Sequence, residues 1–446
     1  MSKEGSTEAP TRHPINFNHP DFLDPKKLDD EMRRVFDICH GCRRCFNLCD
    51  SFPKLFDTID ESKNENVENL SSDQFSPVVD ACTLCDMCFM TKCPYVPPHE
   101  FDLDFPHLML RYRAMEFKQG NVSTSLIQLT ETDRNGKLAS FLAPFVNWFT
   151  SRRNKITRFI MEILTGVDRN SELPRYHHKT FGKRNQSKRE INGPAAGRKA
   201  VLYSTCFINY NNLGIGEATQ KVLSNNGVET KLLYPSCCGM PQLEQGNISR
   251  VADNAQKVAA EILPWVDNGY DVIALVPSCA LMLKFEWPLI LPGNQDIKKL
   301  SEATFDISEY IMDMARQKQL QGGLKKIEGG VTIHLACHSR AQNMGPKAVD
   351  MLRMIPDTDV AVVDRCSGHG GSWGIMKSNF ETALRVGGPA AKKAVGSNHG
   401  NVVSECPLAR EHIVQGMKQM GKSNSVNDIT SISHPIEILA KSFEFG

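Results

Sequence analysis

The sequence predicts an α+β multidomain protein. A small α-helical unit comes first, a helical connector follows, and two duplicated α/β units with short parallel sheets come last. Three observations predict this order. Eight of the fifteen cysteines lie in two tight runs before residue 100, and a segment of alternating apolar and basic residues follows them. Beyond about residue 198, short apolar stretches that end in cysteine alternate with helical stretches, and the whole pattern occurs twice.

The two N-terminal cysteine runs have the spacing of a two-cluster ferredoxin. They are C-x2-C-x2-C-x3-C, with Cys39, Cys42, Cys45 and Cys49, and C-x2-C-x2-C-x4-C-P, with Cys82, Cys85, Cys88 and Cys93. Three thiolates at three-residue intervals reach three corners of one iron–sulfur cube, and in such ferredoxins the fourth cysteine of each run binds the other cluster. We therefore assign Cys39, Cys42, Cys45 and Cys93 to cluster 1, and Cys82, Cys85, Cys88 and Cys49 to cluster 2, both of the [4Fe–4S] type.

Zinc and disulfides are the alternatives for these eight cysteines. Zinc usually takes two C-x2-C pairs separated by a longer loop, and disulfides need an oxidising compartment. The amino terminus is polar and lacks the apolar core of a secretory signal. No stretch reaches the ~18 to 20 apolar residues that a membrane-spanning helix requires. We therefore expect a cytoplasmic chain with reduced thiols.

The composition excludes few functions but disfavours one. Lys and Arg number 52 against 51 for Asp and Glu, so the charge balance does not favour nucleic acid as a partner. The length of 446 residues predicts several domains. We place an extended tail at 1–24, the two-cluster ferredoxin-like domain at 25–120, the connector and linker at 121–198, and the two repeats at 199–325 and 326–446.

The connector contains a basic amphipathic stretch. From Ser151 to Ala200 there are thirteen basic and four acidic residues, a local bias that the overall balance conceals. The apolar positions of this stretch are Ile156, Phe159, Ile160, Ile163 and Leu164. Two interpretations stay open. The apolar side packs against the rest of the chain or a partner, or it makes peripheral contact with an anionic membrane surface.

The C-terminal half is an internal duplication. Cys206, Cys237 and Cys279 recur as Cys337, Cys366 and Cys406, at offsets of 131, 129 and 127 residues. Each of these cysteines follows a short apolar strand, and parallel strands bring their carboxyl ends to one edge of a sheet. The first repeat also has Cys238 and so offers four thiolates, enough for a cluster or a tetrahedral zinc.

The second repeat offers three thiolates, because Ser367 stands where the first repeat has its adjacent cysteine. His338 and His369 lie next to the cysteines and could supply a nitrogen ligand. The glycine-rich turn Gly368–Gly374 allows close approach of backbone to a cofactor. It is not a phosphate loop, and no dinucleotide-binding motif is present.

On these residues the chain resembles the CCG-domain iron–sulfur proteins, the superfamily of heterodisulfide reductase and the glycolate oxidase iron–sulfur subunit, and within it the C subunits of anaerobic glycerol-3-phosphate dehydrogenases. The segments that carry the resemblance are Thr205–Asn211, Cys237–Pro241, Ser278–Leu281 and His434–Ala440. The resemblance implies that the repeats are CCG domains, with a third iron–sulfur cluster or zinc in them. Met282 and Ala409 replace the last cysteine of the CCG motif, so a five-thiolate site is complete in neither repeat.

The function expected from these features is electron transfer. Iron–sulfur clusters carry single electrons, and the sequence shows no substrate-binding or hydride-transfer motif of its own. We therefore assign no catalytic residue and expect one component of an oxidoreductase complex rather than a complete enzyme. The expected partners are a flavoprotein dehydrogenase and a quinone or another redox carrier. Two alternatives remain, a catalytic thiol or heterodisulfide reductase and a non-redox metal-binding scaffold.

Overall fold

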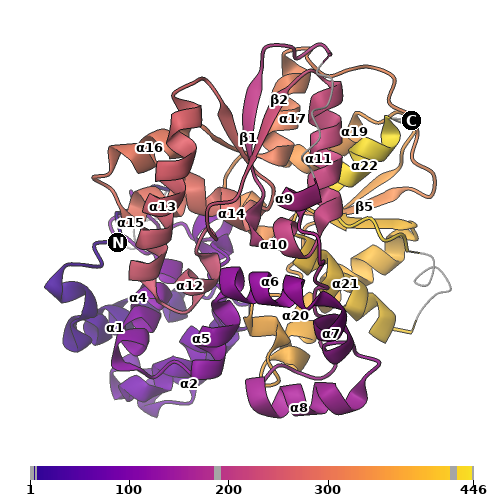
Figure 1. Ribbon diagram of the computed structural model, residues 1–446. Helices are drawn as coiled ribbons and strands as arrows, with labels where there is room; N and C mark the ends of the chain where they lie inside the picture. Colours follow the sequence, from indigo (N-terminus) through magenta and orange to yellow (C-terminus); the bar gives the residue numbers. More distant parts are fainter. Residues whose placement is uncertain (1–4, 6–7, 185–191, 422–428, 444–446) are drawn as a thin grey trace.

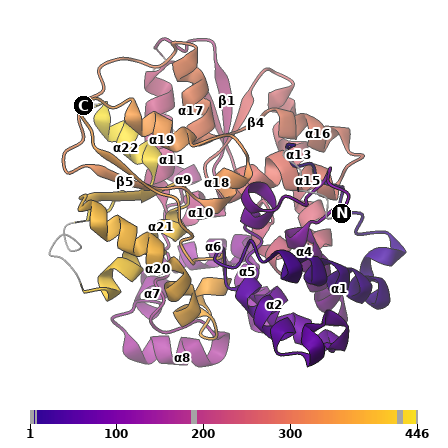
Figure 2. The ribbon, with the colours of Figure 1, turned by 180° about the vertical axis from the view of Figure 1, so that it is seen from behind.

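The computed structural model describes residues 5, 8–184, 192–421 and 429–443, and Figures 1 and 2 show it from opposite sides. Helices make up most of the described residues, and the named strands form two short parallel sheets. This confirms the predicted α+β class. Of the predicted connector and linker at 121–198, residues 185–191 lie outside the described part of the chain.

The eight-cysteine unit is helical. Its elements are η1 (Pro20–Leu23), α1 (Pro25–Cys42), α2 (Ser51–Asp60), η2 (Lys63–Glu65), η3 (Val67–Asn69), η4 (Ser72–Phe75), α3 (Ser76–Ala81), the π-helical turn η5 (Cys88–Lys92) and α4 (Phe105–Gln119). Helix α1 begins where the Asp24 side chain accepts a hydrogen bond from the amide of Lys27. It ends at Arg43, which has a φ of 52°. The left-handed turn at Arg43 redirects the chain so that Cys45 follows the last turn of α1.

Aromatic packing gives this unit its core. Phe36 on α1 lies edge-on to Phe75, with ring centroids 5.2 Å apart, and stacks on Phe105 of α4 at 6.2 Å. Phe52 of α2 reaches the same Phe105 at 4.7 Å. All four rings are buried, and such ring pairs add stability beyond the area they bury. The aromatic core therefore holds the helices that carry the first cysteines.

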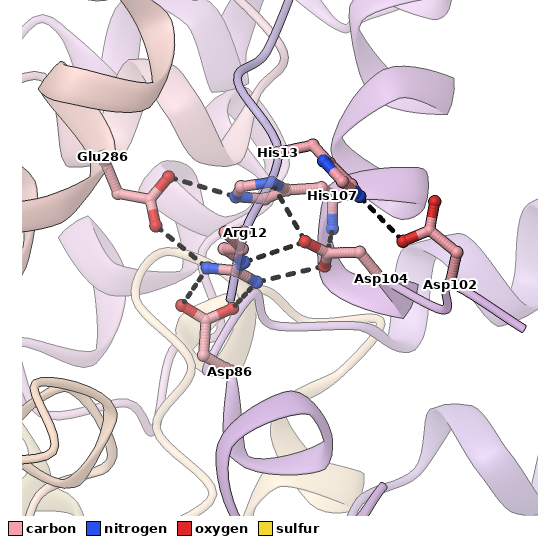
Figure 3. A network of polar contacts seen from close by, with 7 residues as sticks. All are labelled: Arg12, His13, Asp86, Asp102, Asp104, His107 and Glu286. Carbon is pink, nitrogen blue, oxygen red and sulfur yellow. Dashed lines mark hydrogen bonds and ion pairs between the residues drawn. The ribbon is translucent and has the colours of Figure 1, made fainter. Parts of the chain in front are cut away.

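The N-terminal segment is fixed by a partly buried arginine. The Arg12 guanidinium donates to Asp86, Asp104 and Glu286, as Figure 3 shows. Asp86 lies in the second cysteine run, Asp104 caps α4, and Glu286 belongs to the first α/β unit. His107 also contacts Asp104 and Glu286, each at 3.2 Å. One side chain of the tail thus joins three separate parts of the chain.

The described part of the connector contains five helices. They are α5 (Thr124–Thr130), α6 (Thr132–Phe141), α7 (Ala143–Phe149), α8 (Lys155–Thr165) and α9 (Phe181–Arg184). Helix α6 reaches the first α/β unit, where the ring of Tyr210 occupies the space that a side chain at Gly136 would need. Helix α8 lies at the lower edge of the molecule in both views (Figures 1 and 2). The connector therefore runs from the interior to the periphery.

The first sheet has four parallel strands in the order β2-β1-β3-β4. Its strands are β1 (Lys199–Tyr203), β2 (Glu229–Leu233), β3 (Asp271–Ala274) and β4 (Thr304–Asp306). Its helices are α10 (Thr205–Tyr210), α11 (Leu213–Asn225), α12 (Met240–Glu244), α13 (Ile248–Val266), α14 (Pro277–Leu281), the π-helical turn η6 (Met282–Glu286), α15 (Trp287–Ile290), α16 (Gln295–Glu302) and α17 (Ile307–Arg316). The central strand β1 is almost wholly buried, as expected for a parallel strand covered on both faces.

The second sheet has three parallel strands in the order β6-β5-β7. Its strands are β5 (Val331–His334), β6 (Val360–Val363) and β7 (Asn401–Ser404). Its helices are α18 (Cys337–Ala341), α19 (Lys347–Arg353), the short η7 (Trp373–Ile375), α20 (Phe380–Ser397), α21 (Pro407–Gln419) and α22 (Pro435–Ser442). Strands β5, β6 and β7 take the places of β1, β2 and β3, which agrees with the duplication found in the sequence. Among the residues that the structure describes, the short β4 has no counterpart in this sheet.

The two sheets share one apolar core. Buried residues of α11, α17, α19 and α22 join side chains of both sheets in a single cluster that continues into the eight-cysteine unit. Helix α22, which follows the second sheet, packs against α11 of the first unit. A smaller, separate core lies between β6, β7, α20 and α21. The cysteine-bearing strand ends are therefore held by packing between units as well as within them.

Candidate functional site

All fifteen cysteines are described, and none of them forms a disulfide. Their thiols fall into four neighbouring sets. Set 1 is Cys39, Cys42, Cys45 and Cys93, set 2 is Cys49, Cys82, Cys85 and Cys88, set 3 is Cys337, Cys366 and Cys406, and set 4 is Cys206, Cys237, Cys238 and Cys279. Sets 1 and 2 belong to the eight-cysteine unit, and sets 3 and 4 lie at the strand ends of the two sheets.

Set 1 brings together cysteines from both sequence runs. Burial raises the pKa of the Cys39 thiol well above its usual value, and the charges of three neighbouring thiols add to the shift. Those neighbours are Cys93, Cys45 and Cys42. Cys93 belongs to the second run but lies beside the first, as the crossed assignment of cluster 1 requires. The four thiols are neighbours, and their role as ligands stays a prediction.

Set 2 shows the reciprocal crossing. Burial raises the pKa of Cys49, and its thiol neighbours are Cys85 and Cys82. The amides of Ser51 and Phe52, at the start of α2, donate to its sulfur and favour the thiolate. In the second run, Leu84 and Asp86 have φ angles of 47° and 61°.

The left-handed backbone of Leu84 and Asp86 curls the second run, so that its cysteines can converge on one site. Burial raises the pKa of Cys85 to about 12. Free thiols with such pKa values stay protonated near neutral pH, and several thiolates close together would repel one another. A cationic metal centre offsets both effects, because it binds the thiolate form and supplies positive charge.

The donor types of sets 1 and 2 are those that an iron–sulfur cluster binds. Among the described residues, no group of three or more His, Cys, Asp or Glu side chains is arranged to hold one metal ion. The thiolates of a [4Fe–4S] cluster bind different iron atoms, so they surround the cluster and do not meet at one point. Four soft thiols in each of sets 1 and 2 suit that kind of group.

Set 4 lies at the carboxyl ends of β1, β2 and β3. Cys206 follows β1, Cys237 and Cys238 follow β2, and Cys279 lies on α14 after β3. The sulfur atoms of Cys206 and Cys237 are 3.9 Å apart. Hydrogen bonds from Cys206 and Cys238 hold the pKa of Cys237 below its usual value, and the same bonds raise the pKa of both donors. One thiolate in this set is thus stabilised by its neighbours.

A carboxylate from the connector makes hydrogen bonds to the backbone and side chains beside set 4. Asp133 of α6 accepts hydrogen bonds from the Cys237 amide at 2.9 Å and from the Ser236 hydroxyl at 3.1 Å. It also accepts one from the hydroxyl of Tyr234. On the other side, the Trp287 indole donates to the carbonyl of Cys238 at 3.0 Å. Sequence reasoning missed Asp133, and no motif around it gives a signal, because its partners lie more than a hundred residues away.

Set 3 lies at the carboxyl ends of β5, β6 and β7. Cys337 begins α18, Cys366 follows β6, and Cys406 caps α21. Burial and the charges of other thiols raise the pKa of Cys337, and Cys366 and Cys406 are two of those thiols. Cys366 is exposed, and its sulfur accepts a hydrogen bond from the Gly368 amide at 3.3 Å.

The two histidines of the second repeat have different surroundings. The Nε2 of His338 donates to the carbonyl of Leu84 at 3.3 Å, so this nitrogen already has a backbone partner. The Nε2 of His369 is buried and has no hydrogen-bond partner. Burial lowers the pKa of His369 to about 3, and His412 beside it adds to the effect. His369 lies beside His412, with ring centroids 5.9 Å apart, and the proposed role of both histidines as ligands stays a prediction.

The four sets form a continuous series. Cys45 of set 1 is a neighbour of Cys88 in set 2. Cys85 of set 2 is in turn a neighbour of Cys366 and Cys337 in set 3. Both repeats contact the eight-cysteine unit, but the thiols next to set 2 are those of the second repeat and not those of the first.

The series ends at set 4. Cys406 of set 3 is a neighbour of Cys279 in set 4. Helix α14, which carries Cys279, packs against α18, which begins with Cys337. In the order of the thiols, set 3 therefore lies between set 2 and set 4.

The glycine-rich turn fixes this arrangement. Gly368, Gly370 and Gly371 have positive φ angles of 75°, 55° and 60°. A side chain at Gly370 would meet the Cγ2 atom of Thr83 at 2.6 Å. Thr83 lies between two cysteines of set 2, so only glycine lets the turn approach the second cysteine run this closely. The turn therefore docks the second repeat on the eight-cysteine unit.

Comparison with known proteins agrees with this site. Residues 200–284, which include all of set 4, match the family model of the cysteine-rich CCG domain. The chain contains a CCG domain. It is 28% identical over 322 residues to the C subunit of anaerobic glycerol-3-phosphate dehydrogenase from Escherichia coli K12, and the match covers 70% of this chain and 76% of the relative.

Two further relatives are named as components of reductases. The B subunit of fumarate reductase (CoM/CoB) from Methanothermobacter marburgensis is 23% identical over 420 residues, 90% of this chain and 70% of the relative. The D subunit of heterodisulfide reductase from Methanosarcina acetivorans is 24% identical over 240 residues, 51% of this chain and 56% of the relative. The relatives are thus components of redox complexes.

Among the described residues, no helix has the length and apolar character needed to cross a bilayer.

Proposed function

We propose that this chain is an iron–sulfur electron-transfer subunit that relays electrons between a partner dehydrogenase and a quinone or another redox carrier. The observation that carries the proposal is the unbroken series of thiol sets from Cys39 to Cys206. A scaffold with unrelated metal sites has no need for adjoining sets, whereas electron transfer depends on closely spaced carriers. The kinship with components of a dehydrogenase and of reductases supports a redox role.

Sets 1 and 2 would each hold one [4Fe–4S] cluster. Such clusters, when bound, accept and release single electrons. Set 4 has four buried or half-buried thiols and would hold a third cluster or a zinc ion. Set 3 has three thiols and would need another ligand, for which His369 is the candidate with an unpartnered ring nitrogen. The chain's own contribution is to bury these groups and fix their order.

The partners follow from what the chain lacks. Neither the sequence nor the described residues contain a recognisable nucleotide- or flavin-binding motif, so oxidation of a substrate would take place on another subunit. We propose a flavoprotein dehydrogenase as that subunit. The proposed location is the cytoplasm, with peripheral contact at the inner face of the cytoplasmic membrane, where a quinone would be the second partner.

One observation favours a second function, a thiol or heterodisulfide reductase. Cys237 is stabilised as a thiolate by Cys206 and Cys238, and a thiolate is the nucleophile in disulfide exchange. Met282 and Ala409 argue against it. Both are buried at the positions where the CCG motif would place its last thiol. Reduction of a disulfide substrate by the isolated chain would establish this alternative.

The relay proposal is tested with protein purified without oxygen. We expect visible absorption and, after reduction with dithionite, electron paramagnetic resonance (EPR) signals from two [4Fe–4S] centres. Cys42→Ser and Cys85→Ser should each remove one of them. Cys366→Ser is the matched control, because the exposed Cys366 belongs to neither set and both signals should remain. Colourless, zinc-loaded protein would instead indicate a non-redox scaffold.

A further inference from the structure

Helix α8 has its apolar side outward and its polar side inward. Its inward residues are Thr157, Arg158, Met161 and Glu162, all buried. Its outward residues are Ile156, Phe159, Ile160, Ile163 and Leu164, all exposed, and Ile156 and Leu164 are 74% and 70% exposed. This is the reverse of a helix that packs on a protein core. Packing of this apolar side against the rest of the chain is therefore wrong, whereas docking on a partner and contact with a membrane both remain.

Hydrogen bonds and ion pairs fix α8 in this orientation. The Arg158 guanidinium donates to the carbonyls of Arg169, Asp168 and Ser171 at 2.7 to 3.0 Å. On the next turn, Glu162 pairs with Arg169 at 2.5 Å and with Lys377 at 3.1 Å. Rotation of the helix to hide its apolar side would break these contacts and leave the backbone carbonyls that accept from Arg158, and the cations paired with Glu162, without their partners. These contacts therefore hold the apolar side of α8 outward.

The two preceding helices extend the apolar surface. Their exposed apolar residues are Leu138, Phe141 and Leu142 of α6 and its end, and Phe145 and Trp148 of α7. Phe141 is 74% exposed, and the rings of Phe145 and Trp148 lie 5.9 Å apart. Together with the outward residues of α8 they form what we call the α6–α8 face. Exposed apolar groups on this scale mark an interaction site.

The surroundings of the α6–α8 face are basic. Between residues 134 and 179, eight Lys and Arg residues are exposed, against one exposed carboxylate, that of Glu172. The eight are Arg134, Lys137, Arg152, Arg153, Lys155, Arg169, Arg175 and Lys179. Glu172 is already paired with Arg152 at 2.8 Å. In the described part of the chain, neither Arg153 nor Lys155 has an ion-pair partner, so their charges are available to an anionic surface.

We propose that the α6–α8 face docks on an anionic lipid bilayer. Apolar residues with Trp and Phe on one side, and Lys and Arg around them, are what a helix needs to lie in the headgroup region of an anionic membrane. The positive charge around the face favours an anionic lipid surface over a second copy of this chain as the binding partner, because two such basic surfaces would repel each other. This inference deepens and rests on the proposed peripheral location, but it does not depend on any cluster.

The docking face is joined to the thiol series. The amide of Lys377 donates to the carbonyl of Gly166, and that of Asp168 donates to the carbonyl of Ile375, both at 2.8 Å. Residues 375 and 377 follow the glycine-rich turn, which follows the exposed Cys366. Docking through this face would therefore hold the set 3 end of the molecule at a defined place relative to the membrane.

Vesicle binding tests the inference on the full chain, purified without oxygen. Wild-type protein should sediment with vesicles that contain phosphatidylglycerol and much less with pure phosphatidylcholine vesicles. Ile163→Glu, and separately the double change Arg153→Glu with Lys155→Glu, should each weaken binding at least about ten-fold. Phe285→Glu is the matched control, since it alters an exposed aromatic residue outside the face, and it should bind like the wild type.

Fluorescence separates insertion from adsorption. Trp148 should shift to shorter wavelength with phosphatidylglycerol vesicles, and Trp148→Phe should lose that shift. The proposal is overturned if the wild type binds neither vesicle, if the face variants bind as well as the control, or if only a partner protein covers the face. Iron content is measured on the same samples, so loss of the clusters and loss of docking are distinguished.

Discussion

The Arg12 guanidinium holds Asp86 through two hydrogen bonds, of 2.7 and 3.1 Å. Asp86 lies between Cys85 and Cys88, so this ion pair ties the N-terminal segment to the loop of set 2 (Figure 3). Burial works against the charge of Arg12, yet three carboxylates raise its pKa well above the usual value. Arg12 therefore stays charged and compensates buried carboxylates beside a predicted cluster.

We expect Arg12→Ala to destabilise the protein by about 3 to 5 kcal/mol, because it leaves buried carboxylates without their cation. The measurement is anaerobic thermal denaturation together with iron content. Arg250→Ala, at an exposed position on α13, is the control and should change little. An unchanged melting temperature for Arg12→Ala would contradict this role.

Asp133→Ala should loosen set 4 and leave sets 1 and 2 intact. The substitution removes the acceptor of the Cys237 amide and of Ser236, and an unpaired buried amide costs about 1 to 3 kcal/mol. Alkylation followed by mass spectrometry should show faster labelling of Cys206 and Cys237 than in the wild type. Lys137→Ala, on the exposed side of the same helix, should label at the wild-type rate. Equal rates in all three proteins would show that Asp133 does not close the site.

Much of the local structure follows from the sequence. The three-residue cysteine spacing predicts the curled runs, and the crossed positions of Cys49 and Cys93 follow from the ferredoxin pattern. The apolar strands that end in Cys206 and Cys337 predict the matching sheets.

Other features depend on contacts that no local pattern encodes. Arg12 meets Glu286 from 274 positions away. The docking of the second repeat on set 2 depends on Gly370 meeting Thr83, and the outward face of α8 depends on bonds from Arg158 to a later turn. The short β4 is defined by its pairing with β3 rather than by a strong strand pattern of its own.

Glu244 predicts a pH dependence near neutrality. Burial raises its pKa from 4.5 to about 7, although Arg113 opposes the shift. The fold thus favours the neutral carboxyl, and this contribution to stability is full below pH 4.5 and lost as the pH rises through about 7. Glutamine imitates the neutral form, so Glu244→Gln should gain stability relative to the wild type over that interval.

The measurement is the anaerobic melting temperature of both proteins across this interval of pH. Glu261→Gln, at an exposed position on α13, should follow the wild type at every pH. A constant difference between Glu244→Gln and the wild type would mean that Glu244 does not titrate in this range.

The crossed assignment of Cys49 and Cys93 is the most direct test of the cluster sites. EPR spectra of reduced Cys93→Ser, Cys42→Ser and Cys85→Ser should be compared with wild-type protein that contains at least about eight iron atoms per chain. We predict that Cys93→Ser loses the same centre as Cys42→Ser and keeps the one that Cys85→Ser loses. A Cys93→Ser spectrum that matches Cys85→Ser, or wild-type protein without iron, would contradict the account.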